Sequence, residues 1–377
     1  MKFIHISDLH IGKRLNEYSL IEDQKFILRE ILNIIDEEKP VGVLIAGDVY
    51  DKTVPSAEAV TVLDEFLTSL AKKGVQTFLI SGNHDSPERL AFGSRLMEQS
   101  GIHISQTYDG NIEPISLKDG QEEVYIYMLP FIKPANVRRY FDEEIDSYND
   151  AVRIAVSKMN IDCTKNNILI THQFVTGAVR SESEEISVGG TDNVDASNFD
   201  CFDYVALGHI HSPQNCASPR VRYCGTPLKY SFSEANDEKS VTVVEICGKS
   251  IDIKAVPLKP LHDMVEIKGK YDDIMKKSFY EGTTYCTDYT HITLTDENDV
   301  LDAIGKLRTV YHNLMRLDYD NKRTRGASKI DNSENIEAKT PLELFEEFFE
   351  LQNNQKITEI QREFVKELIE KIWEGEK

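Results

Sequence analysis

The chain has 377 residues and a formal net charge of −21, which argues against broad electrostatic attachment to nucleic acid or to an anionic membrane. Nucleic acid stays possible as a substrate, because bound divalent cations, a local basic patch or a basic partner could supply the attraction. The apolar runs are only about six residues long, against roughly 20 for a membrane-spanning helix, and residues 1–5 read as a strand rather than a signal peptide.

The first half of the chain alternates strands with helices. Apolar runs at 3–7, 41–46 and 77–81 read as buried strands. An amphipathic helix is expected at Ser19–Glu38, a second from Pro55 to near Gly74, and a third opened by Ser86 and Pro87. This βαβαβα order predicts a largely parallel sheet.

From about residue 102 the expected elements are short strands separated by turn residues. They predict a second sheet that is more antiparallel than the first. The segment 175–199 is long, polar and aperiodic, so we expect a loop that borders a functional site. The predicted strands are 123–128, 220–224, 240–246 and 250–256.

Beyond Pro257–Pro260 the chain reads as a small β-α-β-α-β unit, then a polar linker, then two amphipathic helices. The apolar stripes of these helices either pack on the chain's own core or form a docking hairpin for a partner, and the polar linker favours the hairpin. The expected domains are 1–260, 261–320, 321–339 as linker, and 340–377.

The six cysteines have no C-x-x-C spacing, which excludes a zinc ribbon. We expect most of them to pack as small apolar residues in a reducing cytoplasm.

Metal-type side chains follow five of the apolar runs directly. The carboxyl ends of strands in an α/β sheet are where ligands bind, so these side chains predict one metal site built from distant parts of the sequence. The candidate ligands are Asp8, His10, Asp48, Asn83, His172, His209 and His211.

This mixture of carboxylate, imidazole and amide groups suits Mn²⁺, Fe²⁺ or Zn²⁺ better than Ca²⁺. Seven ligands exceed the needs of one tetrahedral site. They suffice for two metals if one carboxylate bridges, and such a pair is the usual arrangement for phosphoryl displacement.

His84 is left outside the ligand set. It follows Asn83, and the neighbouring Asp85 could orient its ring. We expect His84 to stabilise the transition state or protonate the leaving group. The alternative is a histidine that only buttresses Asn83.

The motifs D-x-H, G-D-x-x-D, G-N-H-D, an isolated histidine and G-H-x-H together resemble the calcineurin-like metallophosphoesterase superfamily. The resemblance implies a four-layered α/β/β/α sandwich. It also implies that Asp48 bridges two metals, one held by Asp8, His10 and His211 and the other by Asn83, His172 and His209.

Segments 48–56, 188–191, 203–209 and 225–234 look like the SbcD exonuclease subunit family. That resemblance implies an Mn²⁺-dependent 3′→5′ exonuclease on duplex DNA and an endonuclease on single strands and hairpins, acting in DNA repair, recombination and replication. It implies a capping domain that helps to bind DNA, C-terminal helices that dock on the SbcC ATPase, and a homodimer within a heterotetramer. No phosphate-binding G-x-x-x-x-G-K-[ST] loop is present, so ATP would act only through the partner.

At one position the chain departs from the family pattern. Archaeal and eukaryotic relatives carry a histidine where this chain has Asp51, so Asp51 is expected to support the site rather than to take over that histidine's role. Two other functions stay open. One is a phosphatase or cyclic-nucleotide phosphodiesterase, against which Lys52 weighs, and the other is a non-catalytic scaffold, against which the complete ligand set weighs.

Overall fold

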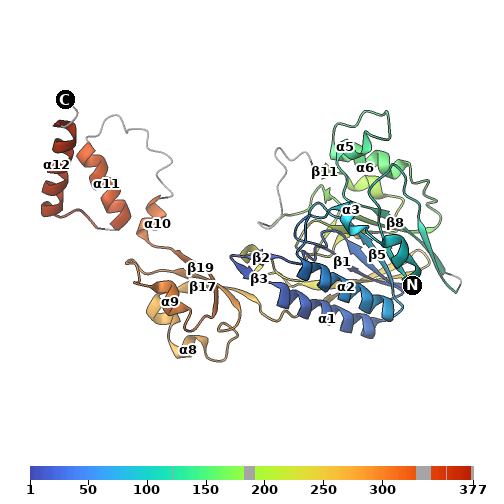
Figure 1. Ribbon diagram of the computed structural model, residues 1–377, viewed down its shortest axis with the longest axis horizontal. Coiled ribbons are helices and arrows are strands. Elements are labelled where there is room, and N and C mark those ends of the chain that lie inside the picture. Colours follow the sequence, from blue (N-terminus) through green and yellow to red (C-terminus); the bar gives the residue numbers. More distant parts are fainter. Residues whose placement is uncertain (121, 182–191, 328–340, 354, 375–377) are drawn as a thin grey trace. The chain divides into compact units, whose positions relative to one another are not determined.

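The computed structural model describes residues 1–120, 122–181, 192–327, 341–353 and 355–374 (Figure 1). It divides into two compact units, Met1–Asp263 and Met264–Lys377. Within the described residues, no helix has the length and apolar character needed to cross a membrane.

The first sheet has the strand order β16-β15-β1-β4-β5-β6. Its four N-terminal strands are parallel, as predicted, while β15 and β16 continue the sheet antiparallel to β1. The strands are β1 (Lys2–Ile6), β4 (Gly42–Ala46), β5 (Gln76–Ile80), β6 (Ile102–Ile104), β15 (Ser240–Cys247) and β16 (Ser250–Pro257).

Two long helices, α1 (Ile21–Glu38) and α2 (Ala57–Lys72), connect the first parallel strands. The Ser56 hydroxyl caps α2 by accepting a hydrogen bond from Ala59 N at 3.2 Å. The predicted third helix is only one turn, α3 (Pro87–Leu90), because Gly93 adopts a left-handed conformation (φ 75°) before α4 (Ser94–Met97).

The second sheet has the order β13-β14-β12-β9-β8-β7. Its members are β7 (Ile115–Asp119), β8 (Glu122–Leu129), β9 (Asn166–His172), β12 (Tyr204–Gly208), β13 (Gln214–Cys216) and β14 (Ser218–Tyr223).

The prediction of a more antiparallel second sheet is wrong for its centre. The strands β8, β9, β12 and β14 are parallel, and only the edge strands β7 and β13 are antiparallel. The sequence prediction missed the helices α5 (Pro134–Val137) and α6 (Tyr148–Ser157), which provide the crossover that parallel strands β8 and β9 require. The predicted strands at 240–246 and 250–256 exist, but they belong to the first sheet.

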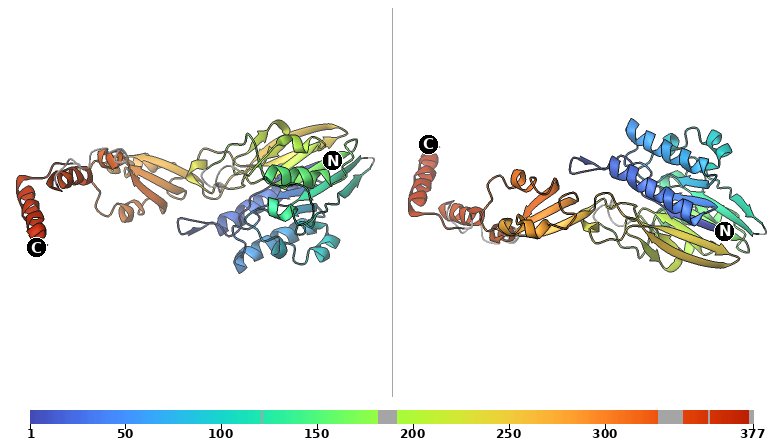
Figure 2. Two further views of the ribbon diagram at one scale, coloured as in Figure 1. Left: turned by 90° about the horizontal axis from the view of Figure 1, so that it is seen from above. Right: turned by 90° about the horizontal axis from the view of Figure 1, so that it is seen from below.

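The two sheets pack face to face through a shared apolar cluster. Phe3, Leu44 and Phe78 of the first sheet meet Ile126, Ile170 and other residues of the second. Residues of α6 pack on the opposite face of the second sheet. In both views of Figure 2 the blue helices α1 and α2 lie on one side of this unit, and the yellow strands lie on the other. The predicted α/β/β/α layering is confirmed.

The second unit contains a three-stranded parallel sheet, in the predicted element order. Three short helices accompany it, and the core that they share with the sheet includes Ile274 and Leu307. These elements are β17 (Met264–Gly269), α7 (Tyr271–Ile274), α8 (Lys277–Tyr280), β18 (Tyr289–Leu294), α9 (Ala303–Leu307) and β19 (Asn313–Tyr319).

Three more helices follow in sequence, α10 (Lys322–Ala327), α11 (Pro341–Asn353) and α12 (Glu359–Glu374). The first part of the predicted linker is therefore helical, and its remainder, 328–339, lies outside the described residues. The glycine-containing segment 188–191 also lies outside the described residues.

The remaining short strands are β2 (Arg14–Leu15) and β3 (Tyr18–Ser19), which form a hairpin, and β10 (Phe174–Val175) and β11 (Asn193–Val194), which pair in parallel.

The cysteines depart from the expected apolar packing. Cys163 and Cys201 form a disulfide with a Cα–Cα distance of 5.0 Å, and Cys247 is exposed. Only Cys216 and Cys224 are buried as predicted. The sequence spacing could not reveal the pair, because the two residues approach only when β9 and β12 lie side by side.

We predict that Gly208→Ala lowers the free energy of unfolding by about 3 kcal/mol or more. A methyl group there would overlap the Ala46 carbonyl oxygen and lie 2.7 Å from His172 Nδ1. Urea denaturation would measure the effect, with Gly42→Ala as the control, since the nearest atom there is 3.0 Å away and belongs to the Phe3 side chain, not to the backbone. Equal losses for the two variants would contradict the prediction.

Candidate metal centre

All seven predicted ligands meet at the carboxyl ends of β1, β4, β5, β9 and β12. Asp8, His10 and His211 form one group whose donor atoms lie within 4.8 Å of one another, and Asp8, Asp48 and His172 form a second such group. Six of the seven side chains are buried, and Asn83 is half-buried.

Asn83 and Asp48 connect the histidines of this cluster. Asn83 Oδ1 lies 3.0 Å from His172 Nε2 and 3.0 Å from His209 Nδ1. Asp48 Oδ2 lies 3.3 Å from His172 Nε2 and 3.8 Å from His10 Nε2. Asp48 therefore lies between the two sets of side chains, which is where a bridging carboxylate would have to be.

The orientation of His172 is fixed by the backbone. Its Nδ1 lies 2.8 Å from the Ala46 carbonyl oxygen, which can only accept, so Nδ1 carries the hydrogen. The Nε2 atom is then the ligand atom, and it faces Asn83 and Asp48.

Burial makes the protonation states of the site unusual. It lowers the pKa of His209 to about 3 and that of His10 well below its ordinary value. Burial would also lower the pKa of His172, but the carboxylate of Asp48 outweighs it and raises the pKa to about 9. Conversely, burial would raise the pKa of Asp48, yet His172 holds it well below the usual range.

Several candidate ligands have strained backbones. Positive φ values occur at Asp8 (53°), His10 (43°), Asp48 (47°) and His209 (104°). Non-glycine residues rarely adopt this conformation, and it persists where surrounding contacts impose it. Such residues concentrate at functional sites, which supports the assignment of this edge of the sheets as the site.

The donor set fits divalent metal ions of the borderline class. It combines four imidazoles, the carboxylates of Asp8 and Asp48 and the amide oxygen of Asn83 in one cluster of side chains. His10 directs Nε2 into this cluster, 3.3 Å from His211 Nε2, while its Nδ1 faces Asp51 at 3.9 Å and has no hydrogen-bond partner among the described residues.

Comparison with known proteins agrees with this geometry. Residues 1–213 match the family model of calcineurin-like phosphoesterases. Over 387 aligned residues, covering 100% of each chain, the sequence is 34% identical to the D subunit of the nuclease SbcCD from Staphylococcus epidermidis. The chain belongs to the SbcD family of the calcineurin-like phosphoesterases. The resemblance predicted from the motifs is thereby confirmed.

The C-terminal part of the chain also matches a family model. Residues 260–353 match the one described as the type 5 capsule protein repressor C-terminal domain. Among solved structures, a dimetal phosphatase from Danio rerio is 10% identical, covers 69% of this chain and 98% of its own, and has a TM-score of 0.40. A protein of Thermus thermophilus is 9% identical, with coverages of 67% and 98% and a TM-score of 0.37.

His84 lies beside the ligands of this SbcD-family site. Its backbone N–H donates to Asp48 Oδ1 at 2.9 Å, and its Nε2 is 4.0 Å from Asp48 Oδ2. Its Nδ1 donates to the Asp51 carbonyl oxygen at 3.1 Å. The ring is therefore oriented by a backbone carbonyl, and the expectation that Asp85 orients it is wrong.

Asp85 instead holds two loops together. Its buried carboxylate accepts hydrogen bonds from the backbone N–H groups of Val49, Tyr50 and Gly82 at 2.9–3.0 Å. The carboxylate of Asp51 binds Lys13 Nζ at 2.8 Å and lies 3.9 Å from His10 Nδ1. Both residues support the site from outside the ligand set.

Two supporting residues were not found by sequence reasoning. Ser7 Oγ donates to Asp8 Oδ2 at 2.5 Å, and Gln24 Nε2 donates to the His10 carbonyl oxygen at 2.8 Å. Gln24 lies on the buried side of α1, where a glutamine looks like any polar helix residue in the sequence. Only its burial, at 1% exposure, marks it as structural.

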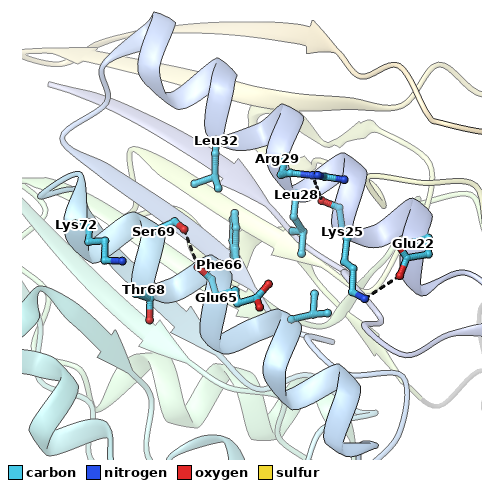
Figure 3. A pocket seen from close by; sticks show the side chains of 11 residues that line it. Glu22, Lys25, Leu28, Arg29, Leu32, Glu65, Phe66, Thr68, Ser69 and Lys72 are labelled. Carbon is cyan, nitrogen blue, oxygen red and sulfur yellow. Dashed lines mark hydrogen bonds and ion pairs between the residues drawn. The ribbon is translucent and has the colours of Figure 1, made fainter.

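Some of the basic residues near the site form ion pairs within the protein, and others line a cavity. Lys13 and Lys229 form ion pairs with Asp51 and Asp263. Arg14 and Lys52 line a cavity of about 390 Å³ beside Asp51. The larger groove between α1 and α2, about 480 Å³, contains none of the candidate ligands (Figure 3).

We predict that the chain, freed of metal by a chelator, loses up to about 3 kcal/mol of unfolding free energy between pH 6.5 and 9. The pKa of His172 is raised to about 9 from 6.5, so the folded state binds this proton more tightly. The stabilisation is complete below pH 6.5 and is lost as the pH rises through 9. Urea titrations across this range would measure it. The slope should disappear in Asp48→Asn, and an unchanged slope in that variant would contradict the explanation.

Proposed function

We propose that this chain is the nuclease subunit of an SbcCD complex and that it hydrolyses DNA phosphodiesters with two divalent metal ions, Mn²⁺ foremost. The observation that carries the proposal is the position of Asp48 between two groups of buried donors. The 34% identity to a nuclease subunit over the full chain supports it independently.

In this proposal Asp8, His10 and His211 hold one ion, and Asn83, His172 and His209 hold the other, with Asp48 shared. Two such ions, when bound, supply a nucleophile at neutral pH and neutralise charge on the phosphate. The low pKa of His10 and His209 keeps these rings neutral and ready to bind a cation. His172 would have to release its proton first, because Asp48 stabilises the charged form and raises the pKa.

His84 would act on the substrate directly. Its side chain is 23% exposed, whereas the histidine ligands around it are buried. The hydrogen bond from Nδ1 to the Asp51 carbonyl leaves Nε2 as the atom that can face a phosphodiester. A protonated Nε2 could donate to a phosphate oxygen or to the leaving 3′ or 5′ oxygen.

The proposed reactions are 3′→5′ exonuclease cleavage of duplex DNA and endonuclease cleavage of single strands and hairpins, serving DNA repair, recombination and replication in the cytoplasm. We assign residues 1–260 to the nuclease domain, 261–320 to a capping domain that contributes to DNA binding, and 321–339 to a linker. The complete enzyme would be a homodimer within a heterotetramer.

Residues 340–377 would dock on the SbcC ATPase, through which alone ATP would act. The support is a row of large apolar side chains left exposed on α11 and α12. Phe348 is 57% exposed, Ile360 84% and Phe364 65%. Exposed apolar rows at helical spacing are typical of helices that bind a partner groove.

The first test is DNA cleavage by the purified chain with Mn²⁺, with and without SbcC. Cleavage is expected, and its absence in both cases, or turnover of a phosphoprotein instead, would contradict the proposal. His84→Gln should reduce cleavage by about 10²–10⁴-fold without changing the bound metal. His312→Gln, an exposed histidine of the second unit, is the control and should cleave normally.

The second test concerns the partner. Phe364→Asp should abolish co-elution with SbcC in gel filtration while basal Mn²⁺-dependent cleavage persists. Lys366→Asp on the same helix changes the charge more but alters an exposed polar position, so it should retain binding. Retained binding by Phe364→Asp would exclude this face of α12 as the docking surface.

A further inference from the structure

The segment 225–239 packs behind His211, and the proposed function gives it no role. Its central residue, Glu234, is fully buried at 0% exposure. Glu234 Oε1 lies 3.6 Å from His211 Nδ1. The other ring nitrogen, His211 Nε2, lies 3.3 Å from His10 Nε2 inside the candidate metal centre. One edge of the His211 ring is thus directed at the donor cluster and the other at a carboxylate.

The second member of this arrangement is Lys239, which is 5% exposed. Lys239 Nζ lies 2.6 Å from Glu234 Oε2 and 2.9 Å from the His211 carbonyl oxygen. The lysine therefore compensates the buried charge of Glu234 and holds the backbone of the same histidine whose ring faces Glu234.

The rest of the segment brings these groups close to His211. Thr226 N donates to the His211 carbonyl oxygen at 3.0 Å. Gly225 has a φ of 78°, and a Cβ atom there would lie 2.6 Å from that same oxygen, so only glycine permits the approach. Tyr230 connects the same segment to the loop that follows β1, because its hydroxyl donates to the Leu9 carbonyl oxygen at 2.5 Å.

We propose that the Glu234–Lys239 ion pair positions His211 for metal binding. The Glu234 carboxylate, 3.6 Å from His211 Nδ1, favours the tautomer with its hydrogen on Nδ1, which directs the lone pair of Nε2 into the site. Lys239 fixes the carbonyl of His211 and holds the Glu234 carboxylate in place at 2.6 Å. Carboxylates that bind the remote nitrogen of a ligating histidine orient its ring and raise its basicity. This inference rests on the metal site of the proposed function.

Stabilisation of the fold alone does not explain why the Glu234–Lys239 ion pair is buried beside His211. Burying two charges costs free energy that their attraction offsets only with good geometry, and apolar residues of the same volume often serve stability as well or better. Here both charged groups contact His211, one at its side chain and one at its backbone, and their contacts with Thr226, Tyr230 and Asp237 are longer at 3.4–3.5 Å than the 2.6 Å ion pair. That convergence is expected of a positioning element and is not needed to fill a core.

The test is a titration of the full-length, metal-stripped chain with Mn²⁺, in which free Mn²⁺ is followed by its electron paramagnetic resonance signal. The parent chain should bind two equivalents. Glu234→Gln should weaken one equivalent about 10-fold and leave the other unchanged. Glu238→Gln makes the same chemical change at an exposed neighbour of Lys239 and should bind as the parent does.

A second variant, Glu234→Leu with Lys239→Met, controls for misfolding. It removes both buried charges together, so neither is left unpaired in the core. Its thermal unfolding midpoint in a chelator should stay close to that of the parent, while one Mn²⁺ equivalent weakens about 100-fold. Parent-like binding of both equivalents by the two variants would overturn the inference. Failure of the parent to bind Mn²⁺ would overturn the proposed function instead.

Discussion

The architecture of this site depends on compensating the negative charge of Asp48, which is buried away from water. Its side chain is buried, and an isolated buried carboxylate would be very costly. His172 and His10 approach one of its oxygens, and the backbone N–H of His84 donates to the other. These partners come from strands distant in sequence, so the two sheets must bring the carboxyl ends of their central strands to a common edge.

Convergence of these groups requires backbone conformations that the chain would not adopt by itself. The left-handed residues Asp8, His10, Asp48 and His209 each cost on the order of 1–3 kcal/mol. The supporting hydrogen bonds are correspondingly dense, since Asp85 fastens two ligand loops and Gln24 fastens a third. Burial of the apolar cluster between the sheets stabilises the fold and offsets the free-energy cost of these backbone conformations.

The sequence was sufficient to predict that the seven candidate side chains meet, because each follows an apolar run and parallel strands end at one edge. The sequence alone could not identify the residues that support these side chains. Gln24 and Asp85 look like ordinary polar residues until their burial is known, and sequence could not show that a carbonyl, rather than Asp85, orients His84. Strand direction in the second sheet also failed as a prediction, because the helix α6 that makes the crossover has only 10 residues and does not stand out in the sequence.

The first sheet also joins the two ends of its unit, and this bears on how the chain is synthesised. The amino group of Met1 binds the carbonyl oxygen of Ile246, 245 residues away, and β1 pairs with β15. One edge of β1 therefore lacks its partner until β15 has left the ribosome. At about 5–20 residues per second this takes on the order of tens of seconds. During that time the backbone groups on this edge of β1 are unpaired, and another strand or a chaperone could bind them.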